Sequence, residues 1–505
     1  MLFSSFSFIL LFLPLLLLVW HLVSVWDGRR LEVVLLFFSA AFYAAWGTGF
    51  LALLGIMLGM NYLFGLLLAT SPDDGSGPMG LSRRGLLTVG LVCNLLPLSW
   101  FKYSAFIVEI LGQLFQYQCD FQAPTLPPGI SFYSFIQIAW LVNIYRQQTS
   151  PQGFVRHALF STCFCYVISG PIVRYEQLGR QLECLRGLDI DWLARGFSLF
   201  SMGLAKKIIM ADSLAVYANA IFNAAERGFP LSPFEAWLGS FCYSFQLYFD
   251  FSGYTDMALG LGLMLGLRLP ENFNSPYKAT GIIEFWRRWH ITLSAWLRDF
   301  LYIPLGGNRT GRLRQYSNLV LTMFLGGLWH GAGWTFIIWG FLHGLMLSIN
   351  HFFRMQIRNR QLENILTLLP IRLCSAALTF LCINACWVIF RAASLKGALR
   401  MYTTMLEGVT SLPTLFSNVS AGLVAPLLLP HQYLQGWQPF ALLAVSAVLI
   451  WIFPNSHEIF LGRNDGTKPW LYWRPSALWS TSLAMLAFTA LLFASRQSTF
   501  LYFQF

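Results

Sequence analysis

The residues best suited to chemistry lie in Leu325–Trp334, a glycine-rich run that places His330 in an apolar stretch. The chain has no Lys, Arg, Asp or Glu between Arg314 and Arg354. An ionisable imidazole inside a membrane is costly unless it has a partner or a task, so His330 is a functional-site candidate. Its glycine neighbours allow close backbone approach and a helix break: Gly326, Gly327, Gly331 and Gly333. We predict that His330 is catalytic, because an imidazole can accept a proton or carry a group at neutral pH.

A second histidine, His290, lies within Ile282–Phe300, a segment that the residue spacing predicts to be an amphipathic helix. One face of that helix is apolar: Trp286, Trp289, Leu293, Trp296, Leu297 and Phe300. His290 follows Trp286 by four residues, at the edge of this face, so it should point inward. A lone inward histidine is more often a core residue than a catalyst, but two such histidines in Trp-rich motifs favour a shared site.

The stretch from Glu284 to Arg314 contains six arginines and only two acidic residues. Arg287, Arg288 and Arg298 are the candidates within the predicted helix, and Glu284 can pair with Arg288 four residues on. One explanation is topogenic charge and contact with lipid headgroups, and the residues alone favour it. The other is a docking surface for a polyphosphate such as coenzyme A, since arginine forks match phosphate geometry.

Two carboxylates interrupt the apolar segment Phe245–Asp256. Gln246, Asp250 and Tyr254 recur every fourth residue and share a helix face. Buried carboxylates need partners, which Arg287, Arg288 or a histidine could supply. A structural ion pair between helices and a direct role in binding substrate both remain open for Asp250.

Several other chemistries lack their signatures in this sequence. His290 and His330 show no spacing typical of a zinc site, and we expect no metal. The sequence contains no Walker loop, nucleophile elbow or dinucleotide-binding fingerprint. The net charge of +11 reflects Lys and Arg in loops between apolar runs, so we expect no nucleic-acid binding.

The elements that must position these residues are membrane helices. The chain is 56% hydrophobic and 11% charged, with a mean hydropathy of +0.58, whereas soluble domains carry about 25% charged residues. Its apolar runs predict an all-α polytopic membrane protein with roughly eleven to thirteen transmembrane and re-entrant helices. We expect one integral-membrane domain over residues 1–505, with N-terminal helices (1–150), core helices (151–355) and C-terminal helices (356–505).

The loop charges predict the orientation of these helices. Arg29 with Arg30, and Arg83 with Arg84, mark two cytoplasmic loops, whereas Gln118–Pro128 has Asp120 and no Lys or Arg. Gln118–Pro128 and the N-terminus should therefore lie outside, as should a long loop near 407–435. The first apolar run is expected to be a membrane helix and not a cleaved signal peptide.

A series of specific motifs runs along nearly the whole chain. They are Met1–Ser5, Trp100–Tyr103, Pro128–Tyr133, Gly170–Tyr175, Tyr248–Tyr254, Glu271–Asn274, Phe285–His290, Trp296–Asp299, Leu305–Arg309, Trp329–Gly331 and Leu501–Phe505. Together these motifs resemble the alginate O-acetyltransferase branch of the membrane-bound O-acyltransferase superfamily. The chain departs from the usual pattern of this branch at Asn143, at Ala393 and in the Pro127–Pro128 pair. These departures leave the identity of the polymer undecided and do not affect the histidines.

The resemblance implies a ring of membrane helices around a thin centre with a funnel, where His330 is the catalytic and His290 the second motif histidine. It implies transfer of acetyl from cytoplasmic acetyl-coenzyme A, a substrate and not a bound cofactor, in the bacterial inner membrane. A periplasmic partner of the serine-hydrolase-like SGNH type would then esterify an alginate- or cellulose-like exopolysaccharide. We take Trp329 and Asn308, which stand in two of the motifs, as further substrate-binding candidates.

Two rival functions stay open at this point. A D-alanyl transferase of the same superfamily would take its acyl group from a carrier protein, which needs a cytoplasmic docking surface. A polysaccharide exporter would need a wide polar pathway along several helices. The polar groups here are concentrated in Gln246–Asp256, Glu284–Arg309 and His330, which favours a local reaction site. His343, thirteen residues after His330, is a candidate for supporting it.

Overall fold

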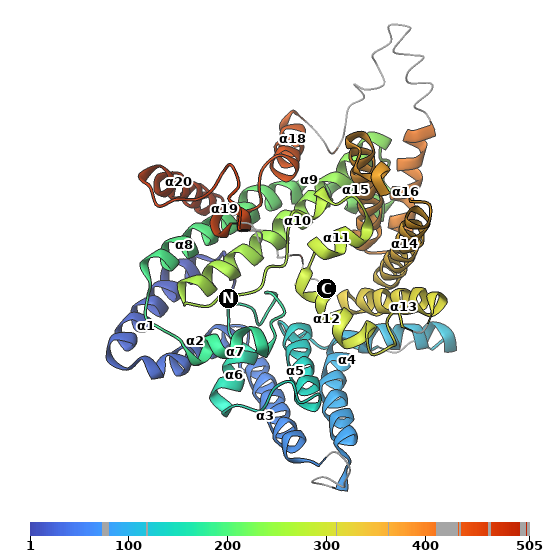
Figure 1. Cartoon of the computed structure of the whole chain (residues 1–505). Coiled ribbons are helices and arrows are strands. Elements are labelled where there is room, and N and C mark those ends of the chain that lie inside the picture. Colours follow the sequence, from blue (N-terminus) through green and yellow to red (C-terminus); the bar gives the residue numbers. More distant parts are fainter. Residues whose placement is uncertain are drawn as a thin grey trace. The chain divides into compact units, whose positions relative to one another are not determined.

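The computed structural model describes residues 1–72, 80–117, 120–309, 311–361, 363–410, 433, 436–462, 466–494 and 501. Figure 1 shows an all-helical chain, and the described residues form no strand beyond an isolated bridge between Phe273 and Trp289. The prediction of an all-α polytopic membrane protein is confirmed. The loop expected near 407–435 lies almost entirely outside the described residues.

Six helical segments within the described residues are long and apolar enough to cross a membrane. They are Phe8–Asp27 (including α1, Leu13–Asp27), α3 (Thr48–Thr70), α4 (Arg83–Phe115), Ile190–Arg227, α14 (Trp334–Asn359) and α15 (Leu369–Arg391). Four apolar helices are shorter: α2 (Leu31–Ala44), α5 (Ile130–Tyr145), α18 (Gln438–Trp451) and α20 (Ala477–Phe493). The apolar runs of the sequence thus divide into full-length spans and shorter helices.

The segment Ile190–Arg227 is continuous but not uniform, because α8 (Ile190–Ala205) passes through a π-helical segment, Lys206–Ala211, into α9 (Asp212–Arg227). The remaining helices are α6 (Phe154–Thr162), α7 (Tyr175–Glu183), α10 (Pro233–Met264), α11 (Ile282–Arg288), α12 (Ile291–Leu297), α13 (Arg312–His330), α16 (Leu395–Thr410) and α19 (Ser456–Leu461).

The chain forms two compact units that each draw on separate stretches of sequence. The first contains Met1–Leu204, Tyr254–Asn272 and Arg474–Ala487. The second contains Ala205–Gly253, Phe273–Trp473 and Phe488–Phe505. The sequence-based organisation into one membrane domain with three consecutive stretches stays a prediction.

In the first unit, a buried amide cluster joins α3, α4 and α5. Asn61 and Asn94 exchange hydrogen bonds, with Asn61 Nδ2 3.0 Å from Asn94 Oδ1 and Asn94 Nδ2 2.7 Å from Asn61 Oδ1. Asn61 Nδ2 also donates to Gln137 Oε1, and all three side chains are fully buried. An unpaired amide in an apolar environment costs several kcal/mol, about 4–8 on the cyclohexane scale, so this pairing fixes the register of the three helices.

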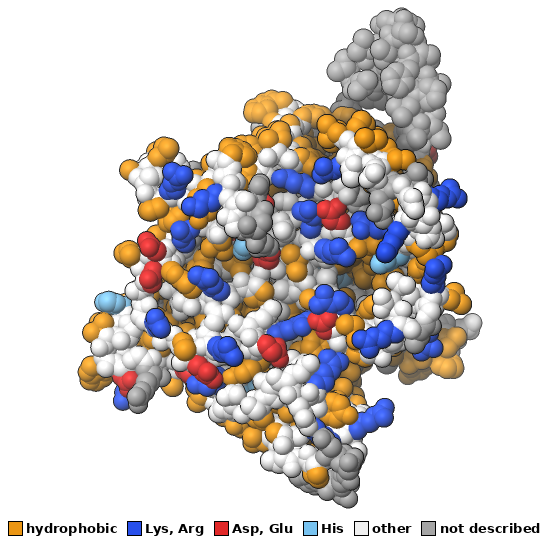
Figure 2. All heavy atoms as spheres, viewed as in Figure 1, with side chains coloured by type: hydrophobic (Ala, Val, Ile, Leu, Met, Phe, Trp, Pro, Cys, Tyr) orange, Lys and Arg blue, Asp and Glu red, His pale blue; other side chains and the backbone are white. Residues whose placement is uncertain are grey.

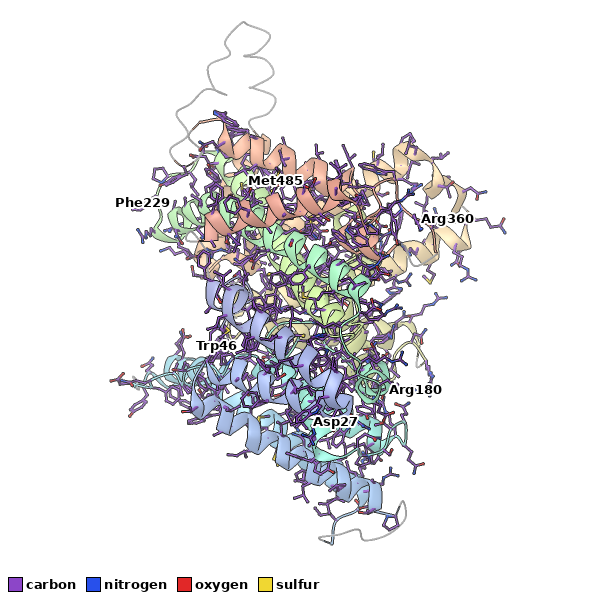
Figure 3. All side chains as sticks on the ribbon, turned by 90° about the vertical axis from the view of Figure 1, so that its left-hand side faces the viewer. Asp27, Trp46, Arg180, Phe229, Arg360 and Met485 are labelled. Atoms are coloured by element: carbon purple, nitrogen blue, oxygen red, sulfur yellow. The ribbon has the colours of Figure 1, made fainter. Side chains whose placement is uncertain are left out.

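The same unit gathers polar side chains at one end of its helices. Arg156 binds Glu32 at 2.9 Å and Glu183 at 2.9 Å. In the view of Figure 3, Asp27 and Arg180 lie to the right of Trp46. Helix α2 spans the chain between Asp27 and Trp46. The orientation of the helices across the membrane, which the loop charges suggest, stays a prediction.

Candidate active site

The candidate site lies in the second unit, where α13 and α14 form a hairpin around the predicted catalytic histidine. His330 is the last residue of α13, and Gly331 and Gly333 adopt extended conformations before α14 begins at Trp334. Figure 1 shows α13 and α14 next to each other. The expectation that these glycines permit a helix break is confirmed.

Glycines also bring the two backbones of this hairpin together. A Cβ atom on Gly340 would collide with the carbonyl oxygen of Met323, and one on Gly344 would lie 2.6 Å from the Cα of Val320. A Cβ atom on Gly327 would lie 2.9 Å from the Cα of Gly340. Small residues four apart are typical of close helix packing in membranes. This packing fixes the end of α13, and with it His330, against α14.

Aromatic rings surround the His330 imidazole, which is 4% exposed. Its ring centroid lies 4.9 Å from Trp329, 5.1 Å from Trp339 and 5.3 Å from Phe390. All three rings meet the imidazole at steep angles, between 70° and 87°. Edge-to-face packing of these rings holds the orientation of the imidazole.

His343, on α14, is the second imidazole of this group. The indole Nε1 of Trp286 donates to His343 Nδ1 at 3.2 Å, and His343 is fully buried. A ring nitrogen that accepts a hydrogen bond carries no proton, so the proton of neutral His343 is on Nε2. Trp339 lies between the two histidines, 4.6 Å from His343 and 5.1 Å from His330. Only the spacing from His330 pointed to His343 in the sequence.

His290 is buried at the junction of α11 and α12, with no exposed surface. Its ring lies 4.8 Å from Phe251 and 6.2 Å from Trp329. Trp329 is thus a common neighbour of His290 and His330. We call the set His290, Trp329, His330, Trp339, His343 and Trp286 the histidine–tryptophan cluster.

The prediction of one continuous helix over Ile282–Phe300 is wrong. The helix breaks at Trp289, which forms the antiparallel bridge to Phe273, and the backbone N of Asn274 donates to Arg288 O at 2.9 Å. His290 then takes a left-handed conformation with φ +43°. Such a conformation costs a residue other than glycine about 1–3 kcal/mol and often marks a functional site. Because of this break, the His290 side chain is buried within the second unit.

The three candidate arginines have different surroundings. Arg288 binds Glu284 Oε1 at 2.8 Å and donates to Asn274 O, which confirms the expected Glu284–Arg288 pairing. Burial opposes ionisation of Glu284, but hydrogen bonds from Thr280 and Arg288 outweigh it and lower the pKa of this carboxyl. Arg288 therefore has a structural partner with a stable charge.

Arg287, Arg298 and Asn308 are exposed. Arg298 also binds its neighbour Asp299, 2.6 Å from Oδ1. Figure 2 shows several Lys and Arg side chains over α11, α12 and α13 on the face turned to the viewer. These candidates are therefore placed at the surface of the second unit, whereas the histidines and Trp329 are buried.

Asp250 is buried and ion-paired, but its partner is neither an arginine nor a histidine. Lys207 Nζ lies 2.8 Å from Asp250 Oδ1 and 2.7 Å from Asp212 Oδ1. The backbone N of Leu501 also donates to Asp250 Oδ2 at 3.0 Å. The partners suggested from the sequence, Arg287, Arg288 or a histidine, were wrong. The sequence does contain a signal for the true partner. Lys207 lies inside the apolar run 197–223, and a lysine in such a run is an intramembrane charge that needs an acidic partner.

The described residues contain no group of three or more His, Cys, Asp or Glu side chains that could hold a metal ion. The cluster therefore offers imidazoles, indole donors and a low-polarity surrounding. A neutral imidazole in such a place can take a proton from a hydroxyl group, or accept an acyl group on nitrogen.

Residues 84–386 match the model of the membrane-bound O-acyltransferase family. The chain belongs to this family, and the matched stretch includes both candidate histidines, His290 and His330. The chain is a membrane-bound O-acyltransferase.

Three curated relatives, two named for acetyl transfer and one for D-alanyl transfer, are similar to between 45% and 100% of the chain. The probable alginate O-acetylase AlgI of Azotobacter vinelandii is 43% identical over 81% of this chain and 78% of the relative. The peptidoglycan O-acetyltransferase of Helicobacter pylori is 35% identical over 100% of this chain and 98% of the relative. The teichoic acid D-alanyltransferase of Bacillus subtilis is 29% identical over 45% of this chain and 59% of the relative.

Proposed function

We propose that this membrane O-acetyltransferase moves acetyl groups from cytoplasmic acetyl-coenzyme A across the bacterial inner membrane for O-acetylation of a polysaccharide outside. The observation that carries the proposal is the position of His330 at the break between α13 and α14, beside Trp329, whose ring also neighbours His290. A periplasmic acetyltransferase partner of the SGNH type would deliver the group to the polymer.

Two reaction courses fit an imidazole in this position. As general base, His330 removes the proton of the acceptor hydroxyl while that oxygen attacks the acetyl carbonyl carbon. The carbon–sulfur bond then breaks, and the coenzyme A thiolate takes the proton from the imidazolium. As acetyl carrier, a His330 nitrogen attacks first, releases the thiol, and passes the acetyl group on. Mass spectrometry of the protein after donor addition without acceptor separates the two, because only a carrier becomes acetylated.

The donor would approach from the side of the exposed arginines. Arg287 and Arg298 offer guanidinium groups suited to the phosphates of coenzyme A. From Arg314 to His330, sixteen residues of helix give about 24 Å at 1.5 Å per residue, past the middle of a roughly 30 Å hydrocarbon core. This length supports a histidine that receives the group from one side and releases it to the other. Asp250, in contrast, is proposed to maintain the structure through Lys207.

The acceptor proposed first is an alginate- or cellulose-like exopolysaccharide, since AlgI relatives share about two fifths of their residues with this chain, 43% in the first case. Peptidoglycan is a second candidate, because the Helicobacter pylori relative matches 100% of this chain, against 81% for the Azotobacter vinelandii relative. D-alanyl transfer from a carrier protein is less supported, since the Bacillus subtilis relative matches 45% of this chain.

The test is mass spectrometry of the cell-surface polymers of the host with the wild-type chain, with His330→Ala and without the chain. The acetyl content of one polymer should fall to the deletion level in the His330→Ala strain. His351→Ala, at a partly exposed position on the same helix α14, is the matched control and should retain acetylation. Full acetylation with His330→Ala at equal protein level would overturn the proposal.

A further inference from the structure

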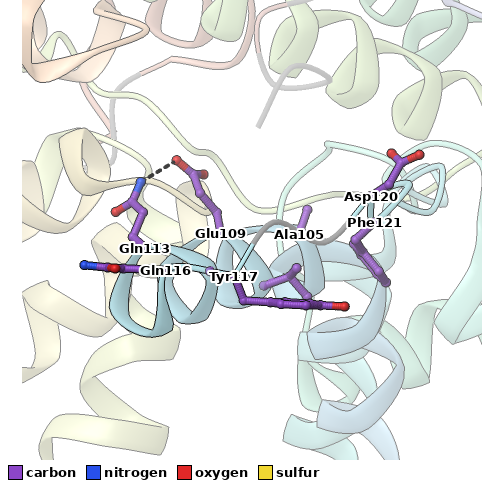
Figure 4. A pocket seen from close by; sticks show the side chains of 9 residues that line it. Ala105, Glu109, Gln113, Gln116, Tyr117, Asp120 and Phe121 are labelled. Atoms are coloured by element: carbon purple, nitrogen blue, oxygen red, sulfur yellow. Dashed lines mark hydrogen bonds between the residues drawn. The ribbon is translucent and has the colours of Figure 1, made fainter.

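The first unit contains an open groove of about 930 Å³ at the end of α4, apart from the residues discussed so far. In Figure 4, Glu109 and Gln113 lie on one side of it, Asp120 and Phe121 on the other, with the Tyr117 ring between them. Gln113 Nε2 donates to Glu109 Oε1 at 3.3 Å.

The groove is built by a tight reversal of the chain after α4. Gln116 adopts a left-handed conformation with φ +52°, and the backbone N of Tyr117 donates to Gly112 O at 3.0 Å. A Cβ atom at Gly112 would lie only 2.8 Å from the carbonyl oxygen of Tyr117, so the turn closes because Gly112 has no side chain. Phe121 packs edge-on against Trp100 at 6.2 Å. The groove wall is therefore fixed by the backbone.

The groove lies at the C-terminal end of α4, the end away from Arg83. The stretch from 118 to 128 after this end contains Asp120 and no Lys or Arg, which is the charge pattern of an external loop. Arg83 and Arg84, at the start of the helix, mark a cytoplasmic loop by the same rule. With Arg83 cytoplasmic, the groove is placed on the outside.

The groove lining has the chemistry that recognises a sugar. The carboxylates of Glu109 and Asp120 accept hydrogen bonds from hydroxyl groups, and the amides of Gln113 and Gln116 both donate and accept. The ring of Tyr117 offers a flat apolar face for the C–H side of a pyranose. A volume of 930 Å³ lies within the usual range of ligand sites, about 300–1,000 Å³.

The charge of the groove selects among sugars. Its nine described lining residues include two acids and no Lys, Arg or His. Two carboxylates without a cation disfavour a polyanion such as a polyuronate through like-charge repulsion. We propose that this groove binds an uncharged segment of a glycan, built from neutral hexoses or N-acetylhexosamines, and rejects polyuronate chains. The outward orientation rests on the proposed function. Of the acceptors proposed there, the groove would hold a cellulose-like polymer or the glycan of peptidoglycan at the outer surface, and not alginate.

The test uses the full-length protein in nanodiscs and ligand-observed NMR with three probes: cellotetraose, a chitin tetramer and tetramannuronate. At least one of the two neutral probes should bind, and tetramannuronate should not. Glu109→Gln and Tyr117→Ala should each weaken binding about tenfold, the effect expected for one lost strong contact. Glu407→Gln, an exposed acid on α16, is the matched control and should bind normally.

Gly112→Ala is a second test of the groove. The added methyl group clashes with the turn but removes no polar group, so this variant should also lose binding. Binding of tetramannuronate as tight as that of the neutral probes, or no change in Glu109→Gln and Gly112→Ala, would overturn the proposal. His330→Ala should bind the probes normally while losing acetyl transfer. If His330→Ala keeps full transfer but the groove variants lose binding, the proposed catalytic role fails and the groove stands.

Discussion

The second unit accommodates polar side chains in its apolar interior in two different ways. In the lysine–aspartate group, Lys207 lies within 2.8 Å of both Asp212 and Asp250, so its charge is compensated. In the histidine–tryptophan cluster, the imidazoles of His330 and His343 pack against indole rings at 5.1 and 4.6 Å from Trp339. Opposite charges in contact hold helices together, whereas aromatic rings fix the position and orientation of an imidazole.

Burial alone does not distinguish a reaction site from a structural ion pair in this chain. Asp250 is 1% exposed and His330 is 4% exposed, so their burial is nearly the same. The difference lies in the neighbours, since a carboxylate tied to lysine and to the backbone N of Leu501 has little freedom to act. Changes in the first group should therefore affect folding, and changes in the second should affect turnover.

The largest stability effect is expected from Lys207→Met, because it leaves two carboxylates buried without their cation. Breaking a buried ion pair by removing one partner costs about 3–5 kcal/mol. The yield of folded protein and its melting temperature, measured by size-exclusion chromatography after heating, should both fall. Adding Asp212→Asn and Asp250→Asn should restore part of the loss. A single Lys207→Met variant as stable as wild type would remove the structural role of this group.

A smaller loss of stability is expected from Gly340→Val, which forces α13 and α14 apart at the carbonyl of Met323. Overpacking a tight contact costs about 1–3 kcal/mol. Since the contact also positions His330, transfer activity per folded molecule should fall together with the melting temperature. Gly55→Val is the matched control, because the space around Gly55 is open. Unchanged activity of folded Gly340→Val would show that the hairpin contact does not position the histidine.

Trp286→Phe is expected to lower turnover with little change in stability. Trp286→Phe removes the indole donor to His343 but keeps an aromatic ring in the cluster. If His343 positions Trp339 against His330, acetyl transfer should slow about tenfold, the value of one hydrogen bond near 1.4 kcal/mol. Initial rates at saturating donor measure this, with the melting temperature as the reference. A fall in melting temperature with unchanged turnover would place His343 among ordinary core residues.

The smallest effects should come from the surface arginines. Arg287→Gln and Arg298→Gln should each raise the KM for acetyl-coenzyme A a few-fold, because exposed charge pairs contribute about 0.2–1 kcal/mol each. The effect should shrink as salt is raised. Arg288→Gln should act differently, lowering stability through the loss of its Glu284 contact. Unchanged KM in the Arg287 and Arg298 variants would leave the exposed arginines with a topogenic role only.

The features that the sequence predicted correctly are those decided by residues close to one another in the chain. The pairing of Glu284 with Arg288 follows from helical spacing, and the helix end at His330 follows from the flanking glycines. The all-α membrane class follows from composition. Each of these features is decided within a few turns of the chain, so the sequence alone contains the signal.

The features that the sequence did not predict depend on contacts between distant segments. The helix break at His290 arises because Trp289 and Arg288 pair with Phe273 and Asn274 instead of continuing the helix. No glycine or proline marks that break. Likewise, the partner of Asp250 is forty-three positions away in the chain at Lys207, on a π-helical segment whose side-chain direction cannot be read from a regular helical period.

The most direct test of the account is a paired measurement on purified His330→Ala in nanodiscs, of acetyl-coenzyme A turnover by thiol release and of thermal unfolding. We predict that turnover falls to background while the melting temperature stays within a few degrees of wild type, since three aromatic rings that pack around the imidazole remain in place. Turnover near the wild-type rate in correctly folded His330→Ala would contradict the account. So would a collapse of stability matching that of Lys207→Met.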